Sequence, residues 1–408
     1  MPINYNACLP VDIFYQQGVT CINLSDYIAG LWGNLTNTIN GLFSNNELGF
    51  AYDFNDLSTL YQDAAGTTPV TGAGQTLGLV LDKSKGLVLG SELIIDPSFD
   101  NPAYWATNSP TVVVTGGNAV FTNSLTGNAI LKDGITLLNK WYKVKIVVPS
   151  ITSVALRVGT SIGTGDLPSP NITSAGVYTF ILPSLGVTRR FQITAVGGPV
   201  NAVVSEISVK ELPGNHAYQT TSSARPLLQK NAITGAYYAK FDGINDFLQT
   251  AAINLSTINS MSLCTAVDQS LAGTGGMIYE FSQSIDTNNG AFSQTGTPSG
   301  GLNYFSSSSK GTAVATTNSS TASASAAILN KMQISTNTLN VLMNGNNYSS
   351  STSQGAGNYG NYPLYIGMRA GTSIAFVGNI YSLIGVGRLI NSSETADLYN
   401  AVAKTVGV

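Results

Sequence analysis

The 408-residue chain carries a formal net charge of −3, and only 10% of its residues are Asp, Glu, Lys or Arg. Its Lys and Arg residues form no block, which argues against a nucleic-acid-binding surface because phosphate neutralisation needs clustered basic groups. No apolar run approaches the roughly 20 residues of a transmembrane helix, and the start lacks the basic and apolar regions of a signal peptide. We therefore expect a protein made in a cytoplasm, without membrane insertion, whose polar surface consists of hydroxyls and amides.

Residues 1–48 predict an arm followed by a helix. Up to about residue 24 the sequence shows no periodicity, which indicates an extended arm that needs a partner to be ordered. From Ser25 apolar residues recur at helical spacing, and three of them are seven residues apart, as in a coiled-coil seam. We predict that this stripe attaches the chain to a particle or joins copies, with a trimer preferred; the alternative is a helix packed on its own domain. The stripe consists of Ile28, Leu31, Trp32, Leu35, Ile39, Leu42 and Phe43.

Three cysteines and one histidine limit the available chemistry. Cys264 lies in an apolar run and is interpreted as a small core residue. Cys8 and Cys21 could meet across a loop, but free thiols are favoured in a reducing compartment. The single His216 excludes a multi-histidine metal site.

Several separated segments predict one β-sandwich domain. Its opening is Asp56-Leu57-Ser58-Thr59-Leu60-Tyr61-Gln62-Asp63, followed by the turn Asp82-Lys83-Ser84-Lys85-Gly86. A hairpin is predicted over 237–248, where apolar residues flank an Asp-Gly and an Asn-Asp pair. The later segments are Leu339–Gly345, Leu364–Gly367, Phe376–Ile380 and a closing helix from Asn391. In this order they resemble the laminin-G-like, concanavalin A-like jelly-roll domains found in bacteriophage virion proteins.

An insertion interrupts this domain. In the family that it resembles, the Asp-Lys-Ser-Gly turn runs directly into Gly-Asn-His-Ala, whereas here those residues are Gly214-Asn215-His216-Ala217. We interpret 88–213 as a domain inserted into a surface loop, since closing a longer loop adds little entropy. The predicted division is the arm and helix at 1–48, a discontinuous jelly roll at 49–87 and 214–408, and the insert at 88–213.

The insert has its own β signature. Short alternating segments, among them 111–115, 141–148 and 177–182, predict strands separated by Gly, Pro and Asn. Its early Asp96-Pro97-Ser98-Phe99-Asp100 and its final Glu206-Ile207-Ser208-Val209-Lys210 resemble carbohydrate-binding-module jelly rolls. The predicted fold class is mainly β: two β-sandwich (jelly-roll) domains, one inserted in the other, with an N-terminal arm and helix.

Residues 283–327 consist mainly of Ser, Thr, Gly, Ala and Asn, a composition also found in disordered linkers. Aromatic residues punctuate the segment and small residues alternate with hydroxyls, which predicts ordered strands and hairpins of the sandwich.

Aromatic side chains beside amides are candidate glycan-binding residues, because flat rings pack against the apolar faces of sugars. Trp141 and Tyr142 are adjacent in a predicted strand, so we expect one to be buried and the other exposed. Tyr359 and Tyr362 lie between glycines and asparagines, and we expect them to be exposed. The candidates are Tyr104, Trp105, Trp141, Tyr142, Tyr359 and Tyr362.

Four carboxylates are candidate calcium ligands, since Ca²⁺ prefers oxygen donors. Asp242 and Asp246 flank the predicted hairpin turn. Asp96 and Asp100 are included because modules of the type that the insert resembles often hold a structural calcium there. The favoured alternative is that all four are turn residues bonding their own backbone. We expect no other cofactor.

The resemblance implies a structural protein of a virion. We expect a tail fibre or spike that attaches to other virion proteins by its N-terminal region and binds bacterial surface polysaccharide during host adsorption. The alternative is a head decoration or head-fibre protein bound to the capsid shell. A depolymerase is a third hypothesis, but no Glu-x-Asp-x-x-Glu arrangement of jelly-roll glycanases and no nucleophile elbow is present. We therefore expect no catalytic residues and a protein that is not an enzyme.

Overall fold

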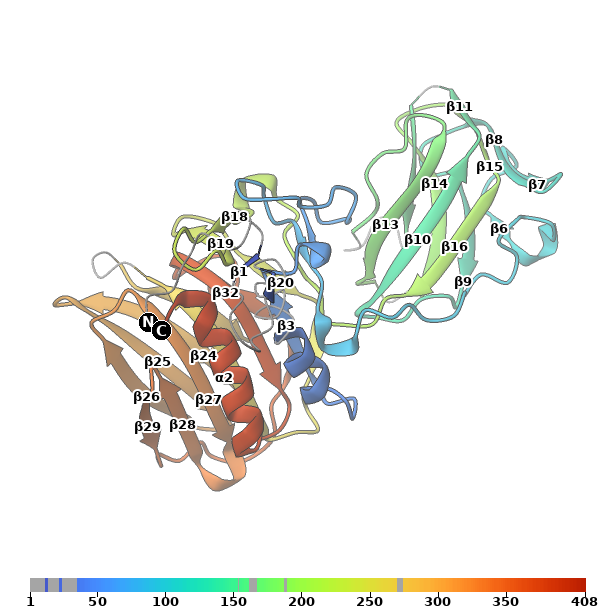
Figure 1. Ribbon diagram of the computed structural model, residues 1–408. Helices are drawn as coiled ribbons and strands as arrows, with labels where there is room; N and C mark the ends of the chain where they lie inside the picture. Colours follow the sequence, from blue (N-terminus) through green and yellow to red (C-terminus); the bar gives the residue numbers. More distant parts are fainter. Residues whose placement is uncertain are drawn as a thin grey trace.

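The computed structural model describes residues 12–13, 22–23, 35–152, 154–160, 167–186, 189–269 and 274–408. Within these residues the protein is mainly β, and its strands form two bodies that lie side by side (Figure 1). This confirms the predicted fold class. We call residues 49–87 and 214–408 the outer body and residues 88–213 the insert, boundaries that we propose from the sequence. No helix of the described residues is long and apolar enough to span a lipid bilayer.

The outer body contains two large antiparallel sheets. The nine-stranded sheet has, in spatial order, β26 (Val314–Thr321), β25 (Leu302–Lys310), β24 (Ala291–Ser299), β23 (Gly276–Phe281), β31 (Leu364–Ile366), β20 (Leu248–Thr250), β17 (Ala217–Tyr218), β5 (Leu79–Val80) and β4 (Leu60–Tyr61). The eight-stranded sheet has the order β18 (Leu227–Lys230), β19 (Tyr237–Asp242), β32 (Val377–Val386), β22 (Ser260–Asp268), β27 (Ser325–Gln333), β28 (Thr338–Met343) and β29 (Asn346–Ser350), with β3 (Gly49–Asp53) also on β32. A smaller ladder of the outer body joins β21 (Ile253–Asn254) to β30 (Asn361–Tyr362). Before the outer body, β1 (Asp12–Ile13) pairs with β2 (Ile22–Asn23).

Strands from before the insert pair with strands from after it in both sheets. β3 lies antiparallel to β32, with Ala51 opposite Ile384. β5 lies antiparallel to β17, with Val80 opposite Ala217. The two separated pieces of chain therefore form one hydrogen-bonded sandwich.

The eight-stranded sheet is buried on both faces, which explains the apolar run of β22. Met261 and Leu263 belong to the core between the two sheets, whereas Cys264 and Ala266 pack in a second cluster with α2 (Ser392–Val406). Cys264 is a buried free thiol, as predicted. The helix begins with the predicted capping box of Asn391 and Glu394, and Gly407 ends it in the left-handed conformation.

The N-terminal helical stripe is buried against its own chain. Residues 35–42 are helical, and Leu35, Ile39, Leu42 and Phe43 join the same cluster as α2 on the sheet. That sheet face is built partly from small side chains such as Ala51, so a helix packs closely and removes it from water. Contrary to the prediction, these four side chains are not available to another copy or to a particle. Ile28, Leu31 and Trp32, like Cys8 and Cys21, lie outside the described residues.

The Ser-rich and Thr-rich stretch 283–327 is ordered, as predicted. β24, β25 and β26 pair in continuous register through it. On their exposed face, hydroxyl and amide side chains bond across the strands, for example Ser306 Oγ to Asn318 Oδ1 at 2.6 Å and Ser308 to Thr316 at 2.9 Å.

The insert contains three small antiparallel sheets around its own apolar core. Their orders are β13 (Gly176–Ser184), β10 (Lys140–Val148), β16 (Glu206–Glu211); β11 (Ser150–Thr152), β15 (Val200–Val204), β8 (Asn118–Ser124), β7 (Val112–Thr115); and β12 (Ala155–Gly159), β14 (Arg190–Val196), β9 (Ala129–Asp133), β6 (Ala106–Thr107). Inward-facing residues alternate along β10, where Val144, Ile146 and Val148 are buried and Lys143 is exposed.

Replacing Ile39 with Ala should lower the free energy of unfolding by about 2–4 kcal/mol, because a fully buried branched side chain would leave a cavity under the helix. The exposed neighbour Asn40 is the matched control, and Asn40→Ala should change stability by less than about 0.5 kcal/mol. Urea unfolding followed by circular dichroism measures both. Equal effects of the two substitutions would contradict the packing of this helix on its own sheet.

Candidate functional site

The buried carboxylate of Asp82 lies where the chain leaves the outer body for the insert. It accepts hydrogen bonds from the backbone N–H groups of Ala51, Ser84 and Asn215 at 2.7, 2.8 and 2.7 Å, and from Ser84 Oγ at 2.8 Å. Burial raises the pKa of Asp82, and the hydrogen bonds oppose that rise. One side chain thereby joins β3, the outgoing turn and the returning segment.

His216 fixes the returning segment from the other side. Its Nδ1 accepts the backbone N–H of Asp82 at 3.0 Å, so the two passages of chain are bonded to each other. Complete burial lowers the pKa of His216 to about 3, which keeps the ring neutral at physiological pH. Gly214 has φ +139°, and a Cβ there would meet His216 Cε1 at 2.7 Å, so only glycine fits this junction.

Trp141 of the insert packs into the outer body at the same junction. Its ring centroid lies 5.3 Å from that of His216 and 5.5 Å from that of Tyr218. A cluster shared by both bodies surrounds it, with Leu79, Leu81 and Tyr218 from the outer body and Trp141, Ile181 and Leu212 from the insert. Aromatic and aliphatic burial of this kind holds the two bodies in a fixed relation.

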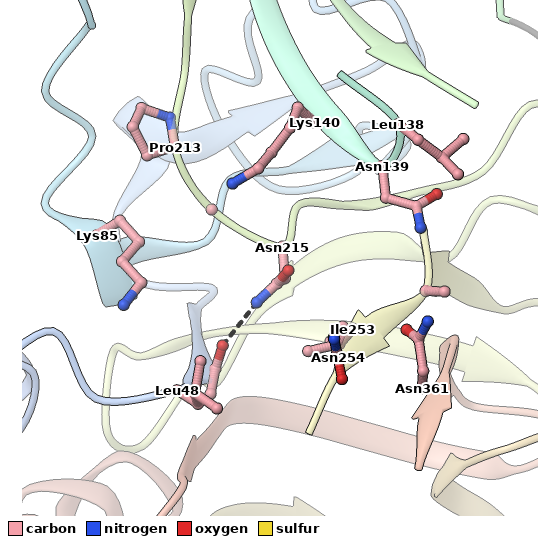
Figure 2. Close-up of a pocket in the computed structure, with 13 residues that line it drawn as sticks. Leu48, Lys85, Leu138, Asn139, Lys140, Pro213, Asn215, Ile253, Asn254 and Asn361 are labelled. Carbon is pink, nitrogen blue, oxygen red and sulfur yellow. Dashed lines mark hydrogen bonds between the residues drawn. The ribbon is translucent and has the colours of Figure 1, made fainter. Parts of the chain in front are cut away.

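Beside this junction the two bodies enclose a cleft of about 460 Å³, within the usual size range of ligand sites (Figure 2). Its walls come from the outer body, from the β10 end of the insert and from the returning segment. We call it the interdomain cleft; it is lined by Leu48, Gly49, Lys85, Leu138, Asn139, Lys140, Pro213, Gly214, Asn215, Ala252, Ile253, Asn254 and Asn361.

Side-chain amides dominate the polar groups of the interdomain cleft. Asn215 Nδ2 donates to the Gly49 carbonyl at 2.8 Å, and Asn254 Oδ1 accepts from the backbone and hydroxyl of Ser256. Within the described residues, the amides of Asn139 and Asn361 have no hydrogen-bond partner in the protein. An amide offers two donors and an acceptor, which matches the hydroxyl groups of a sugar.

Two ammonium groups complete the cleft. Lys85 Nζ donates to the carbonyls of Asn46 and Glu47 at 3.2 and 2.8 Å. Lys140 Nζ lies 3.4 Å from Glu211 Oε1, and half of its side chain is exposed. Burial lowers the pKa of Lys85. The negative charges of Asp82 and Glu47 raise this pKa in part, and the positive charge of Lys140 lowers it further. None of the described lining residues is Asp or Glu.

Four of the six predicted glycan-binding aromatics are buried: Trp105, Trp141, Tyr142 and Tyr359. The expectation that either Trp141 or Tyr142 is exposed is wrong, because the outer body covers Trp141 while Tyr142 lies in the core of the insert. The expectation that Tyr359 is exposed is also wrong, since its ring packs on Phe292 and its hydroxyl lies 3.0 Å from Ser309 Oγ in the core.

The other two predicted residues, Tyr104 and Tyr362, are partly exposed, and each contacts neighbouring side chains. The ring of Tyr104 has Lys132 Nζ 4.1 Å from its centroid. Tyr362 packs edge-on against Phe281 and donates its hydroxyl to the Asn289 carbonyl at 2.9 Å. Tyr362 directly follows the cleft residue Asn361, so one predicted aromatic neighbours the cleft.

The predicted calcium ligands bond the local backbone. Asp96 accepts from the backbone N–H groups of Asp100 and Asn101 and from Trp105 Nε1. Asp100 accepts from Ser98 Oγ, and within the described residues no group of three Asp, Glu, His or Cys side chains could hold a metal ion.

In the hairpin turn, Asp242 Oδ1 accepts from the N–H groups of Ile244 and Asn245, and Asp246 accepts from the N–H of Asp242. Burial and the Asp242 charge raise the pKa of Asp246 to about 6. These are the contacts of turn residues, the alternative favoured by the sequence.

Sequence patterns did not single out the lysines and amides of the interdomain cleft. Lys85 belongs to a turn and Lys140 is the first residue of β10, so neither stands in a recognisable motif. One signal was available: an insertion at 88–213 brings its two ends together, and residues next to both ends must then line a junction.

No protein-family model and no curated protein matches the sequence. Among solved structures, mouse laminin α1 domains LG4–5 share 13% identity over 70% of this chain and 93% of that chain, with a TM-score of 0.30. The extracellular region of zebrafish Gpr126/Adgrg6 shares 12% identity over 72% and 36%, with a TM-score of 0.28. Trypanosoma rangeli sialidase shares 8% identity over 74% and 62%, with a TM-score of 0.34.

The outer body is an antiparallel β-sandwich, in agreement with its strand pairing and with the fold class that the sequence predicted. The matched structures include sialidases, which contradicts the expectation that the protein is not an enzyme. The exclusion of enzymatic activity is therefore withdrawn. Identities of 8–13% and TM-scores below 0.5 assign no reaction and no ligand to this chain.

Acidification should destabilise the protein through His216. Its pKa in the folded state, about 3, lies below its unfolded value near 6.5, so its contribution to stability is present above pH 6.5 and is lost as the pH falls toward 3. The loss approaches about 1.4 kcal/mol per pH unit in this window.

The control is His216→Asn, which keeps an acceptor for the Asp82 N–H but cannot be protonated. Urea unfolding at pH 7.0, 5.5 and 4.5 should show a flatter pH dependence for the variant than for the wild type. If the free energy of unfolding changed equally with pH in both proteins, protonation of buried His216 would not be the cause of acid destabilisation.

Proposed function

We propose that this protein is a virion appendage of the tail-fibre or spike type that binds bacterial surface glycans in the interdomain cleft. The observation that carries the proposal is the cleft itself, where unpartnered amides line a space between two β-sandwich bodies. The virion assignment is supported by the resemblance of segments 49–87 and 214–408 to phage jelly-roll domains. In this role the protein would be exposed on the particle surface.

Glycan binding fits the chemistry of the cleft. Sugar hydroxyls donate and accept hydrogen bonds, and so do the carboxamides of Asn139 and Asn361. The exposed Leu138 and the ring of Pro213 add apolar surface for the C–H faces of a sugar. Each such contact is weak, but several copies on one particle would multiply the binding.

In this proposal the N-terminal region attaches the protein to the particle. Among the described strands, β1 and β2 pair only with each other and with neither body. Homo-oligomerisation as a trimer remains part of the proposal, through contacts other than Leu35, Ile39, Leu42 and Phe43.

A head decoration or head-fibre protein is the second candidate. One observation favours it: helix 35–42 packs within its own chain, so this helix does not form a coiled-coil stalk. Counting copies per virion by quantitative mass spectrometry, with antibody labelling in electron micrographs, distinguishes the two. Many copies on the head would support decoration, and few copies at the tail would support adsorption.

The double variant Asn139→Ala, Asn361→Ala should bind host polysaccharide roughly tenfold more weakly than the wild type, because each lost hydrogen bond contributes about 0.5–1.5 kcal/mol. The matched control is Asn318→Ala, Asn346→Ala, which removes two exposed amides of β26 and β29. Isothermal titration calorimetry with purified capsular polysaccharide and lipopolysaccharide measures both variants.

Binding by neither wild type nor control, together with normal adsorption of a phage lacking the protein, would refute the proposal. Reducing ends measured in the same incubations would report cleavage of the polysaccharide.

A further inference from the structure

We infer that the interdomain cleft selects carboxylated saccharides, with Lys85 and Lys140 holding the carboxylate while Asn139 and Asn361 hold ring hydroxyls. This inference rests on the proposed function and names the ligand class of the same site. It starts from an imbalance of charge: the whole chain is weakly acidic, yet the described lining of the cleft has two cations and no anion.

The charge of Lys85 faces the cleft without a carboxylate partner. Two of its three ammonium hydrogens go to the carbonyls of Asn46 and Glu47, which leaves one donor and the full positive charge. The nearby acids are otherwise engaged. Asp82 is buried among its own four donors, and Glu47 Oε1 accepts from Arg388 at 3.2 Å.

Lys140 is the second cation, and its ion pair is weak. It meets Glu211 at 3.4 Å with half of its side chain exposed, and exposed pairs of this kind contribute little. A ligand carboxylate between the two ammonium groups would relieve the repulsion that Lys140 exerts on Lys85.

The arrangement of the groups matches a sugar acid. In Figure 2 the two ammonium groups lie to one side of Asn215, and the amides of Asn139 and Asn361 lie to the other side. A uronic acid has the same division, with its carboxylate at one end and its hydroxyls around the ring. A neutral sugar would leave both ammonium groups unmatched, and sites built for a polar partner discriminate strongly against analogues that lack it.

The test uses the full chain and two matched ligand pairs: galacturonate and glucuronate oligosaccharides, each beside its carboxyl-reduced counterpart. The wild type should bind at least one acid about tenfold more tightly than its neutral partner. Raising the salt concentration should weaken only the acid complex, because screening acts on the charge pairs. A sulfated galactose oligosaccharide tests whether any anion suffices.

Lys85→Gln and Lys140→Gln should each reduce the ratio of acid affinity to neutral affinity about fivefold, because each variant lacks one ammonium group for the carboxylate. Lys240→Gln, at an exposed position of β19, is the matched control and should keep the full preference. Thermal unfolding of each variant confirms that it is folded.

Equal affinity for acid and neutral forms would overturn the inference and leave glycan binding intact. Equal binding of the sulfated and carboxylated sugars would overturn the selectivity for carboxylates. Binding to host polysaccharide but to none of the acids would also overturn the inference. Absence of binding to host polysaccharide as well, together with normal adsorption of a phage lacking the protein, would refute the proposed function.

Discussion

The hydrogen bonds to the Asp82 carboxylate hold together the three segments of chain that meet between the outer body and the insert. The two carboxylate oxygens satisfy donors from β3, from the outgoing turn and from Asn215 on the return. A buried carboxylate is stable only when such donors surround it, and the donors in turn lose this acceptor if the carboxylate is removed. Because His216 bonds back to the Asp82 N–H, the two passages of chain cannot separate independently.

That junction also determines where the insert lies. The connections hold the end of β10 against β5 and β17, and Trp141 fills the space between them. Lys140 is the first residue of β10, and Asn139 directly precedes it. The same placement brings both residues into one cleft with Lys85 and Asn361 of the outer body. The candidate site therefore results from the way the insert is connected to the outer body, and neither body contains the site alone.

The scarcity of charge gives the interdomain cleft its character. Between β25 and β26, Ser, Thr and Asn side chains bond to one another and no charged group takes part. Two ammonium groups without an acidic neighbour in the lining are therefore a local concentration of positive potential.

Local sequence patterns were enough to predict the mainly-β class, the capped helix at the C-terminus, the burial of Cys264 and the ordered strands of 283–327, because alternation, capping and turn chemistry are local properties. Periodicity states which residues share a face, but not what covers that face. The tertiary structure alone decided that the Leu35–Ile39–Leu42 stripe packs on its own sheet and that Trp141 and Tyr359 are buried. It also brought Lys85 and Lys140 together, since their proximity depends on contacts between segments far apart in the chain.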